Sequence, residues 1–446
     1  MKIGLIAMSG IRCADEELAA LGLSLPGFLD RGAAIASLPS LAMLTLAGAT
    51  PLEHQVEYIE VAALANVPTL PGQFDMVAIS SYSAQILEAY ELADRYRAAG
   101  TPVVIGGPHV SMLPAEAALH CDAVAIGEGE PIWRTIVADC CRGQLQQFYG
   151  AQFSAFNMDD APMPAFHLLD PQKYNRLLVQ TSRGCPHRCE FCAASILIAK
   201  KYKQKPASKV LAEIDSICEI WKHPFVEFAD DNSFINKEYW HEMLPALRKR
   251  QIRWFAESDL SVADDPKLLS LMYESGCSQV LLGLESPEQS AMAGIELNAD
   301  WKKKTFALQK QAVHAIQAHG IRVIGCFVLG LDGHGANVGQ KVIDYAGELE
   351  LFDVQVTVQT AFPGTPLYNR LKSEGRLIEE ANWNKCTLFD VNYHPQGMTN
   401  EQLRNVLIDL TERLYDSQTT GWRRKQFNEK LRQVRRMAKR SKCPAA

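Results

Sequence analysis

The sequence predicts an α/β protein with a doubly wound parallel sheet, a second parallel-sheet region and a mainly helical C-terminal extension. Two observations carry this prediction. Short apolar runs alternate with helical stretches over residues 1–150, and the same alternation returns over residues 176–366. Such alternation favours parallel sheets with helices packed on their faces. Residues 151–175 then form a linker between the two sheet regions, and residues 367–446 form the extension.

Length and composition point to a multi-domain protein in a reducing compartment. The chain has 446 residues, 47% of them hydrophobic, which suffices for about two or three domain cores. No apolar stretch reaches the ~20 residues of a membrane span, and the opening run Lys2 to Met8 is a short strand and not a signal peptide. Twelve cysteines in such a chain are typical of reduced thiols. We therefore expect a cytoplasmic protein.

The first region places loops of small residues after its later strands. Its strand-like runs are Lys2 to Met8, Gln55 to Val61, Met76 to Ser80, Pro102 to Ile105 and Ala123 to Ile126. The loops are Ser80-Ser81-Tyr82-Ser83, Gly106-Gly107-Pro108-His109 and Gly127-Glu128-Gly129-Glu130. Ligands of open α/β sheets bind beyond the carboxyl ends of the strands, where glycines let a bulky ligand approach the backbone. No GxGxxG follows the first run, so a dinucleotide is disfavoured.

The second region opens with a cysteine triplet. Cys185, Cys189 and Cys192 have CxxxCxxC spacing, and they follow a buried strand read from Leu177 to Thr181. A cubane iron–sulfur cluster takes one ligand per iron. Three thiolates therefore leave one iron open for a substrate or cofactor, as in catalytic metal sites. A zinc site is the alternative, for which His187 lies awkwardly close as a fourth ligand.

The triplet, with Phe191 before its last cysteine, resembles the signature of radical S-adenosylmethionine (radical SAM) enzymes. The resemblance implies that a 4Fe-4S cluster on Cys185, Cys189 and Cys192 chelates SAM at its open iron. The reduced cluster then cleaves SAM to methionine and a 5′-deoxyadenosyl radical. It also implies a partial (β/α)6 barrel, which fits the further strand-like runs. These are Leu177 to Thr181, Phe225 to Ala229, Arg253 to Glu257, Gln279 to Leu284, Val323 to Leu329 and Val354 to Thr360.

Polar residues at the ends of these runs are candidates for holding SAM, because barrel sites lie at the carboxyl ends of the strands. By position, Asp230 and Asp231 match the family motif for the SAM amino group, although the usual Gly-Gly-Glu is replaced, and Glu285 matches the ribose position. The full set of SAM candidates is Phe191, Asp230, Asp231, Glu257, Glu285 and Gln359. Phe191 and the backbone around Val328 are expected beside adenine. The alternative is that the acids cap the helices that follow them.

The loops of the first region resemble those of the cobalamin-binding domain that precedes the barrel in one class of radical SAM enzymes. The resemblance covers roughly Lys2 to Gln144. It implies cobalamin contacts from Ser80, Ser81, Tyr82, Gly106, Gly107, His109, Gly127, Glu128 and Gly129. Many such domains carry Asp-x-His-x-x-Gly, whose histidine ligates cobalt, and this motif is absent here. Cobalamin is therefore expected without a lower histidine ligand, and bulky residues at Gly107 or Gly127 are expected to fill its space. A vestigial domain without ligand is the alternative.

The C-terminal extension resembles loosely that of a subgroup with hopanoid methylases and bacteriochlorophyll ring cyclases. Its tail is basic: ten Lys or Arg and one acid follow Gly421, within a chain of net charge −6. Trp422, Phe427, Leu431, Val434 and Ala438 fall roughly on one helical face. The tail is then either a packed terminal helix or a peripheral contact with the inner face of the membrane.

Together these features identify the chain as a member of the cobalamin-dependent radical SAM enzymes. The resemblance implies methylation of an unactivated carbon, a small-molecule or lipid substrate, and an electron donor such as flavodoxin or ferredoxin. A monomer is expected, and no nucleic acid. Cobalamin-dependent cyclisation or rearrangement is the alternative, and a non-catalytic SAM or cobalamin sensor is another. A methylthiotransferase-like RNA modifier is disfavoured, because no second cluster motif precedes the triplet. The sequence identifies neither a catalytic acid or base nor the substrate.

Overall fold

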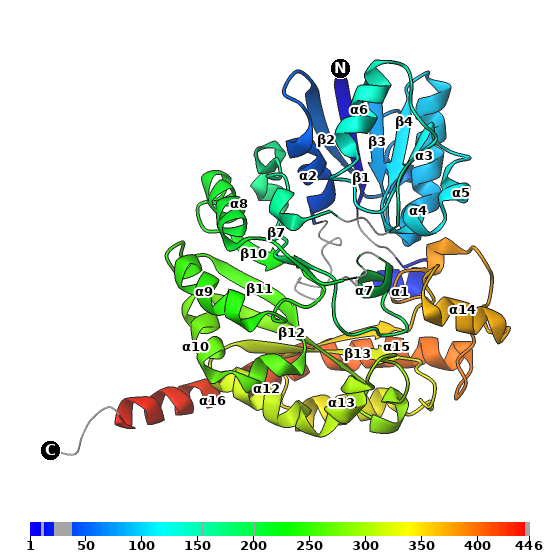
Figure 1. Cartoon of the computed structure of the whole chain (residues 1–446). Coiled ribbons are helices and arrows are strands. Elements are labelled where there is room, and N and C mark those ends of the chain that lie inside the picture. The colour runs from blue at the N-terminus through cyan, green and yellow to red at the C-terminus, as the bar shows by residue number, and fades with distance from the viewer. Residues whose placement is uncertain (10–12, 22–37, 153–155, 198, 200, 442–446) are drawn as a thin grey trace.

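The computed structural model describes residues 1–9, 13–21, 38–152, 156–197, 199 and 201–441, and within them two six-stranded parallel sheets dominate the architecture (Figure 1). The first sheet has the order β2-β1-β3-β4-β5-β6. Its strands are β1 (Lys2–Met8), β2 (Gln55–Val61), β3 (Met76–Ser80), β4 (Val103–Gly106), β5 (Ala123–Ile126) and β6 (Phe148–Gly150). The five predicted strands are confirmed, with β4 shifted by one residue. The three-residue edge strand β6 was not predicted.

Helices cover both faces of the first sheet, because side chains alternate along each strand. On β1, Ile3 and Leu5 pack on one face and Ile6 and Met8 on the other. The helices of this domain are α2 (Leu41–Ala49), α3 (Ile86–Ala98), α4 (Pro108–Met112), α5 (Pro114–Ala117) and α6 (Trp133–Cys141). α2 and α6 pack on the Ile3 face, and α3, α4 and α5 on the Ile6 face. The doubly wound prediction is confirmed.

The second sheet follows chain order, β7-β10-β11-β12-β13-β14, with every pair parallel. Its strands are β7 (Leu177–Val179), β10 (Phe225–Phe228), β11 (Arg253–Ser258), β12 (Cys277–Glu285), β13 (Arg322–Leu329) and β14 (Asp353–Val358). In the described chain β7 and β14 stand at opposite edges, so the barrel is partial as predicted. A two-stranded hairpin, β8 (Ser182–Arg183) with β9 (Lys203–Gln204), was not predicted.

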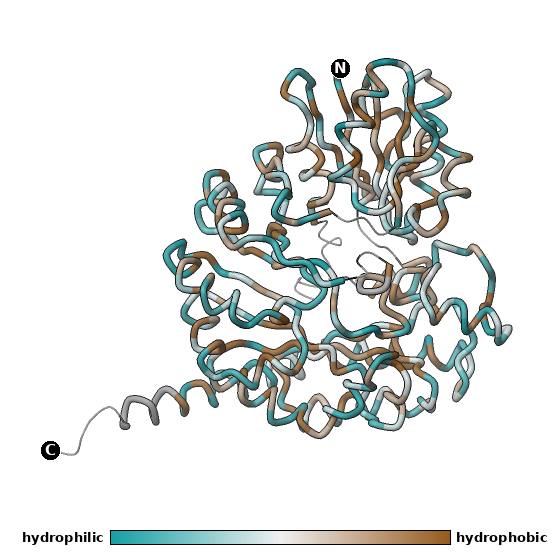
Figure 2. The backbone as a smooth tube through the Cα atoms, viewed as in Figure 1, coloured by the Kyte–Doolittle hydropathy of each residue, from teal (hydrophilic) through white to brown (hydrophobic). Residues whose placement is uncertain are grey.

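Helices close the outer side of the barrel, while Phe255, Leu281 and Ile324 fill part of its interior. The remaining helices before the extension are α1 (Glu16–Ala20), α7 (Ala193–Leu197), α8 (Ala207–Ile220), α9 (Lys237–Arg248), α10 (Pro266–Glu274), α11 (Trp301–Lys304), α12 (Gln309–Ala318) and α13 (Val338–Glu348). Local sequence sets their starts. Asp265 caps α10 through the amide of Leu268, and Pro266 occupies its first turn. Figure 2 shows hydrophobic segments within the sheets and hydrophilic ones on peripheral loops.

The extension is helical and packs on the barrel. It contains α14 (Pro366–Ser373), α15 (Asn400–Tyr415) and α16 (Ser417–Ser441). Thr399 and Gln402 form a capping box at the start of α15, whose Leu403 and Leu407 join the barrel core.

The basic tail is partly a packed helix. Phe427 of α16 is buried against Phe352, with ring centroids 5.2 Å apart. Arg423 pairs with Asp353, and Lys430 pairs with Glu350. Trp422 stays 48% exposed, and Figure 1 shows the end of α16 extending away from the body. Ala438 lies where side chains are not described. Within the described residues, no helix combines the length and apolarity that a membrane crossing needs.

Candidate functional site

The three cysteines occupy one loop between β8 and α7, beside the mouth of the barrel. Gly184 has φ +87°, and a Cβ there would lie 2.9 Å from the Lys201 carbonyl oxygen, so the loop needs glycine before its first cysteine. Burial raises the pKa of Cys185 to about 11 and that of Cys189 further, and each of these thiols is also affected by Cys192. The thiols thus stay protonated until a metal displaces their protons.

The position of His187 bears on the choice between an iron–sulfur cluster and a zinc ion. In the described part of the chain, no group of three or more His, Cys, Asp or Glu side chains is placed so that it could hold a metal ion. The irons of a cubane stand at separate corners, and each takes its own thiolate. The His187 ring is also engaged elsewhere. Its Nε2 lies 3.0 Å from Asp259 Oδ2, and it stacks on Trp301 at 4.5 Å. This arrangement weighs against the zinc alternative.

Two carboxylates that follow β10 brace this loop from inside. Asp230 is buried, and it accepts hydrogen bonds from the Thr181 and Ser182 amides at 2.7 and 2.8 Å and from the Thr181 hydroxyl at 2.6 Å. Asp231 accepts from the Gly184 amide at 2.8 Å. Burial raises the pKa of Asp230 to about 6, although these hydrogen bonds oppose the shift. The structure thus gives Asp230 a role in shaping the loop, and only Asp231 of the two lines the large cavity described below. Their SAM contacts stay predictions.

The other SAM candidates meet at the barrel mouth. Burial raises the pKa of Glu257 to about 8, with further contributions from Glu227 and Asp231. Glu285 ends β12 in the left-handed region, at φ +65°, and Lys302 pairs with it. The register of β12 against β13 shifts at this point. A non-glycine residue rarely adopts such a φ, and such strain clusters at functional sites.

Gln359 and Phe191 complete the set. Gln359 follows β14, is 2% exposed, and its Oε1 has no hydrogen-bond partner among the described residues. A buried amide oxygen without a partner is costly, and a bound ligand with a donor would satisfy it. Phe191 packs on the cluster of side chains that includes Val328, as expected for the adenine position. The groups at the barrel mouth therefore fit SAM.

A cavity of about 610 Å³ lies between the two domains. From the first domain it is lined by the ends of β1, β3, β4 and β5 and by α2. From the barrel it is lined by Leu178, Gln180, Arg183, Ala229 and Asp231. Its floor includes Ser9, whose buried hydroxyl has no partner among the described residues. No histidine is among the described residues that line it, and Gly10, Ile11 and Arg12 of the neighbouring loop lie outside the described residues.

Eight of the nine residues predicted for cobalamin line this cavity: Ser80, Ser81, Tyr82, Gly106, Gly107, Gly127, Glu128 and Gly129. The cavity lies beyond the carboxyl ends of the strands, where ligands of open α/β sheets bind, and this is the position predicted for the corrin. Tyr82 reaches toward the barrel from this side. It is 59% exposed and lines the cavity.

His109 differs from the prediction and does not line the cavity. Its ring is buried, with Nδ1 2.9 Å from Ser83 Oγ and Nε2 3.2 Å from Glu116 Oε1. Trp383 of the extension packs edge-on against the ring, 5.1 Å between centroids. α4 begins directly after Gly107, and the helix turns the histidine away from the strand ends. His109 therefore helps to bind the extension to the first domain.

The role predicted for two glycines also needs correction. A Cβ on Gly127 would lie 2.1 Å from the Ala151 carbonyl oxygen, and one on Gly107 would lie 2.9 Å from that of Ser81. Both have positive φ, +77° and +116°. A larger residue at either position would first distort the backbone. These glycines shape the loops, and their substitution does not test for filled cavity space.

A buried ion network joins the two domains beside the cavity, and sequence reasoning missed it. Arg183, two residues before Cys185, donates to Glu128 at 2.6 Å and to Glu130 at 2.8 Å. Gln180 accepts from Arg183 at 2.9 Å, and Lys203 Nζ lies 2.7 Å from Glu128. The available signal was a basic residue beside the cysteines and a pair of acids in the glycine loop. Asp259 and Lys302 were missed in the same way.

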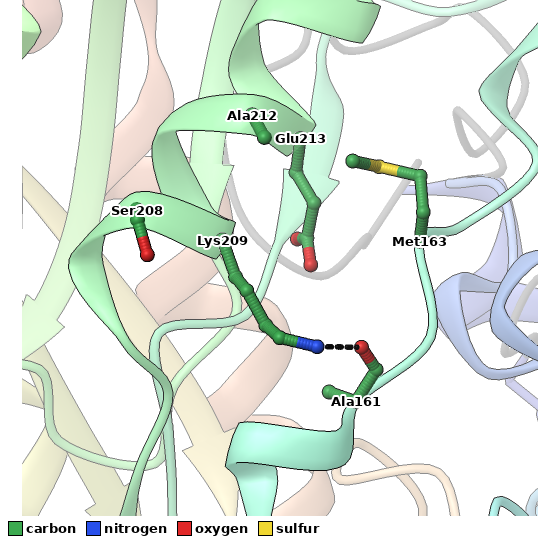
Figure 3. A pocket seen from close by; sticks show the side chains of 6 residues that line it. All are labelled: Ala161, Met163, Ser208, Lys209, Ala212 and Glu213. Carbon is green, nitrogen blue, oxygen red and sulfur yellow. Dashed lines mark hydrogen bonds between the residues drawn. The ribbon is translucent and has the colours of Figure 1, made fainter.

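The linker and the extension hold the domains in this arrangement. Lys209 of α8 donates to the Ala161 carbonyl oxygen at 2.8 Å, beside a smaller cavity of about 180 Å³ (Figure 3). On the opposite side, Trp383 donates to Glu116 at 3.2 Å, and Arg404 pairs with Asp15 at 2.5 Å. The segment after β1 is thus tied to the extension.

Comparison with known proteins agrees with this site. Residues 179–345 match the radical SAM superfamily, residues 37–137 match the B12 binding domain, and residues 365–445 match a domain of unknown function, DUF4070. Bacteriochlorophyllide d C-12(1)-methyltransferase of Chlorobaculum tepidum is 27% identical over 87% of this chain and 84% of its own. Hopanoid C-2 methylase of Rhodopseudomonas palustris is 27% identical over 78% of this chain and 67% of its own.

The fold as a whole also has a solved counterpart. The radical SAM methyltransferase TsrM from Kitasatospora setae, solved with cobalamin and a [4Fe-4S] cluster, superposes with a TM-score of 0.65 at 14% identity. The superposition covers 98% of this chain and 99% of TsrM. The radical SAM and B12-binding domains imply a 4Fe-4S cluster, SAM and cobalamin as the cofactors of the chain. The chain is therefore an enzyme with a radical SAM domain and a B12-binding domain, and it is homologous to cobalamin-dependent radical SAM methyltransferases.

Proposed function

We propose that this enzyme transfers a methyl group to an unactivated carbon of a small molecule or lipid. The observation that carries the proposal is the shared cavity, whose wall combines the glycine loops of the first domain with Gln180, Arg183 and Asp231 of the barrel. A substrate carbon that enters this space lies between the two cofactor regions. Proximity of this kind is the main contribution that a protein makes to cofactor chemistry.

The residues of the chain have separate tasks in this proposal. Cys185, Cys189 and Cys192 would hold the cluster, and the polar groups at the barrel mouth would hold SAM. When bound, the cluster supplies an electron to SAM, and cobalamin supplies the methyl group. Glu257, whose pKa is raised to about 8, carries a proton at neutral pH. A cationic group beside Glu257 would lower its pKa and favour the carboxylate form. Glu257 is therefore suited to bind the SAM ammonium as a carboxylate.

Relatives named as anaerobic magnesium-protoporphyrin IX monomethyl ester cyclases are less similar, at 22% and 24% identity, and the two relatives compared above support methyl transfer. Both are named as methylating enzymes, and their names give a chlorophyll-type pigment and a hopanoid. We infer an apolar carbon skeleton as substrate, because the molecules that both names give are built on one. An apolar cavity also keeps water from a reactive intermediate.

The test is the product balance of the reconstituted enzyme. Purified protein with cluster and cobalamin is incubated anaerobically with SAM, dithionite and a lipid extract from a strain that lacks the gene. We expect one 5′-deoxyadenosine and one S-adenosylhomocysteine for each methylated product. Deoxyadenosine without S-adenosylhomocysteine would point to cyclisation or rearrangement. If the protein cleaves no SAM, whatever its content of cluster and cobalamin, the proposal is contradicted and a non-catalytic sensor is favoured.

A further inference from the structure

One exposed face of the molecule lies directly over the cysteine loop. It is formed by residues 186–190 and by residues 295–304, which pair with them. The Glu190 amide donates to the Ile295 carbonyl oxygen at 2.8 Å, and the Leu297 amide donates to that of Arg188 at 2.9 Å. α11 then begins at Trp301, whose ring stacks on His187. Pro186 and Arg188, each adjacent to a cysteine of the triplet, are exposed. We call this surface the cluster-loop face.

The charges of the cluster-loop face are sorted by sign. Its acidic side chains accept hydrogen bonds or form ion pairs within the protein, whereas its unpaired basic side chains lie on the outside. Glu296 is 3% exposed and accepts hydrogen bonds from four backbone amides, Arg188, Asn298, Ala299 and Trp301. Glu190 pairs with Arg370 at 2.7 Å, and Asp300 accepts from the Gly294 amide at 3.3 Å.

Among the described residues of this face, three cations have no recorded ion-pair partner: Arg188, Lys303 and Lys304. Arg188 and Lys304 are exposed and Lys303 is half-buried. Leu297, at 48% exposure, adds an apolar patch between them. The whole chain carries a net charge of −6, so this cationic face stands out from the overall charge. A cationic rim around a small apolar centre is complementary to an acidic protein.

We infer that the cluster-loop face is the docking surface for an acidic one-electron carrier protein, of the flavodoxin or ferredoxin type. The inference rests on the proposed function, because each SAM cleavage consumes one electron that a donor outside the chain must lose. Electron transfer weakens steeply with distance, so the donor must dock where the cysteines are nearest to solvent. Encounters of this kind use small, transient interfaces that are steered by charge.

The experiment compares a charge-reversed variant with a matched control. Lys303→Glu/Lys304→Glu changes the cluster-loop face, while Lys222→Glu/Lys249→Glu changes two exposed lysines that precede β10 and β11, at the opposite end of the barrel. Anaerobic calorimetry measures the dissociation constant for purified flavodoxin and reconstituted holoenzyme at low salt. SAM cleavage is measured in parallel with flavodoxin and with dithionite as reductant.

We expect Lys303→Glu/Lys304→Glu to weaken flavodoxin binding and flavodoxin-driven cleavage by about tenfold or more, since charge steering contributes about 10 to 10³ in rate. Cleavage with dithionite should stay within about twofold of the unmodified enzyme, and the difference should shrink as salt screens the charges. Unchanged flavodoxin binding by this variant, or an equal loss in the control pair, would overturn the inference. Loss of dithionite-driven cleavage in the unmodified enzyme would instead contradict the proposed function, and the binding comparison would still decide the docking surface.

Discussion

Replacing Arg183 with Gln tests whether the buried network fixes the cysteine loop against the cobalamin side of the cavity. The Arg183 side chain is 13% exposed, and its partners Glu128 and Glu130 are 4% and 11% exposed. Removing one partner of a buried ion pair typically costs about 3–5 kcal/mol, because the remaining charge is stranded. Lys203 still pairs with Glu128, so we take about 3 kcal/mol for the loss.

We expect this loss to weaken cobalamin binding, because Glu128, Glu130 and Arg183 all line the cavity. A loss of 3 kcal/mol corresponds to roughly 150-fold in a dissociation constant, since about 1.4 kcal/mol is tenfold. The linker and the extension share the task of holding the domains, so we expect a rise of at least about tenfold. The assay is titration of cobalamin-free protein with hydroxocobalamin, with iron content measured alongside.

The control is Arg248→Gln, which breaks an exposed pair with Glu274 that is 63% and 47% exposed. Such surface pairs contribute about 0–1 kcal/mol, so cobalamin binding should not change. Arg183→Gln/Glu130→Gln removes the stranded carboxylate as well and should recover part of the affinity. Wild-type cobalamin affinity in Arg183→Gln, with the cluster intact, would refute the reasoning.

Three further predictions follow from the site. Alanine at Cys185, Cys189 or Cys192 should lower bound iron from about four per chain and abolish SAM cleavage, whereas serine at the exposed Cys141 should change neither; retained cleavage in the triple variant would contradict the site. Protein loaded with hydroxocobalamin should hold close to one equivalent with a base-off absorbance spectrum. Ala42→Trp, in the cavity wall, should block loading and Ala98→Trp should not; equal loading of both would place cobalamin elsewhere. If the end of α16 contacts membrane, the protein should co-sediment with anionic vesicles, release as salt rises, and lose binding when residues 421–446 are deleted; equal sedimentation with neutral vesicles would return the tail to a packed helix.

Much of the architecture could be predicted from the sequence, because its signals are local. Strand runs such as Met76 to Ser80 coincide with the observed strands, since apolar length and flanking turn residues decide a buried parallel strand. The cysteine triplet and each glycine loop are likewise short motifs, and their residue types and spacing alone indicate the ligands that they bind. The small edge strand β6 and the hairpin β8–β9 were missed, because such short segments gain their hydrogen bonds only from partners elsewhere in the chain.

Only the tertiary structure decided how the site is assembled. The sequence alone determined that three thiols sit in one loop and that small residues follow the strands of the first sheet. It could not show that Arg183 reaches Glu128 and Glu130, 55 and 53 residues away, that Asp230 braces the cysteine loop, or that His109 turns toward Trp383. Local sequence patterns indicate the secondary structure that a segment adopts. A buried charge needs a partner because leaving it unpaired costs free energy. Which partner is within reach depends on all the elements that pack around it.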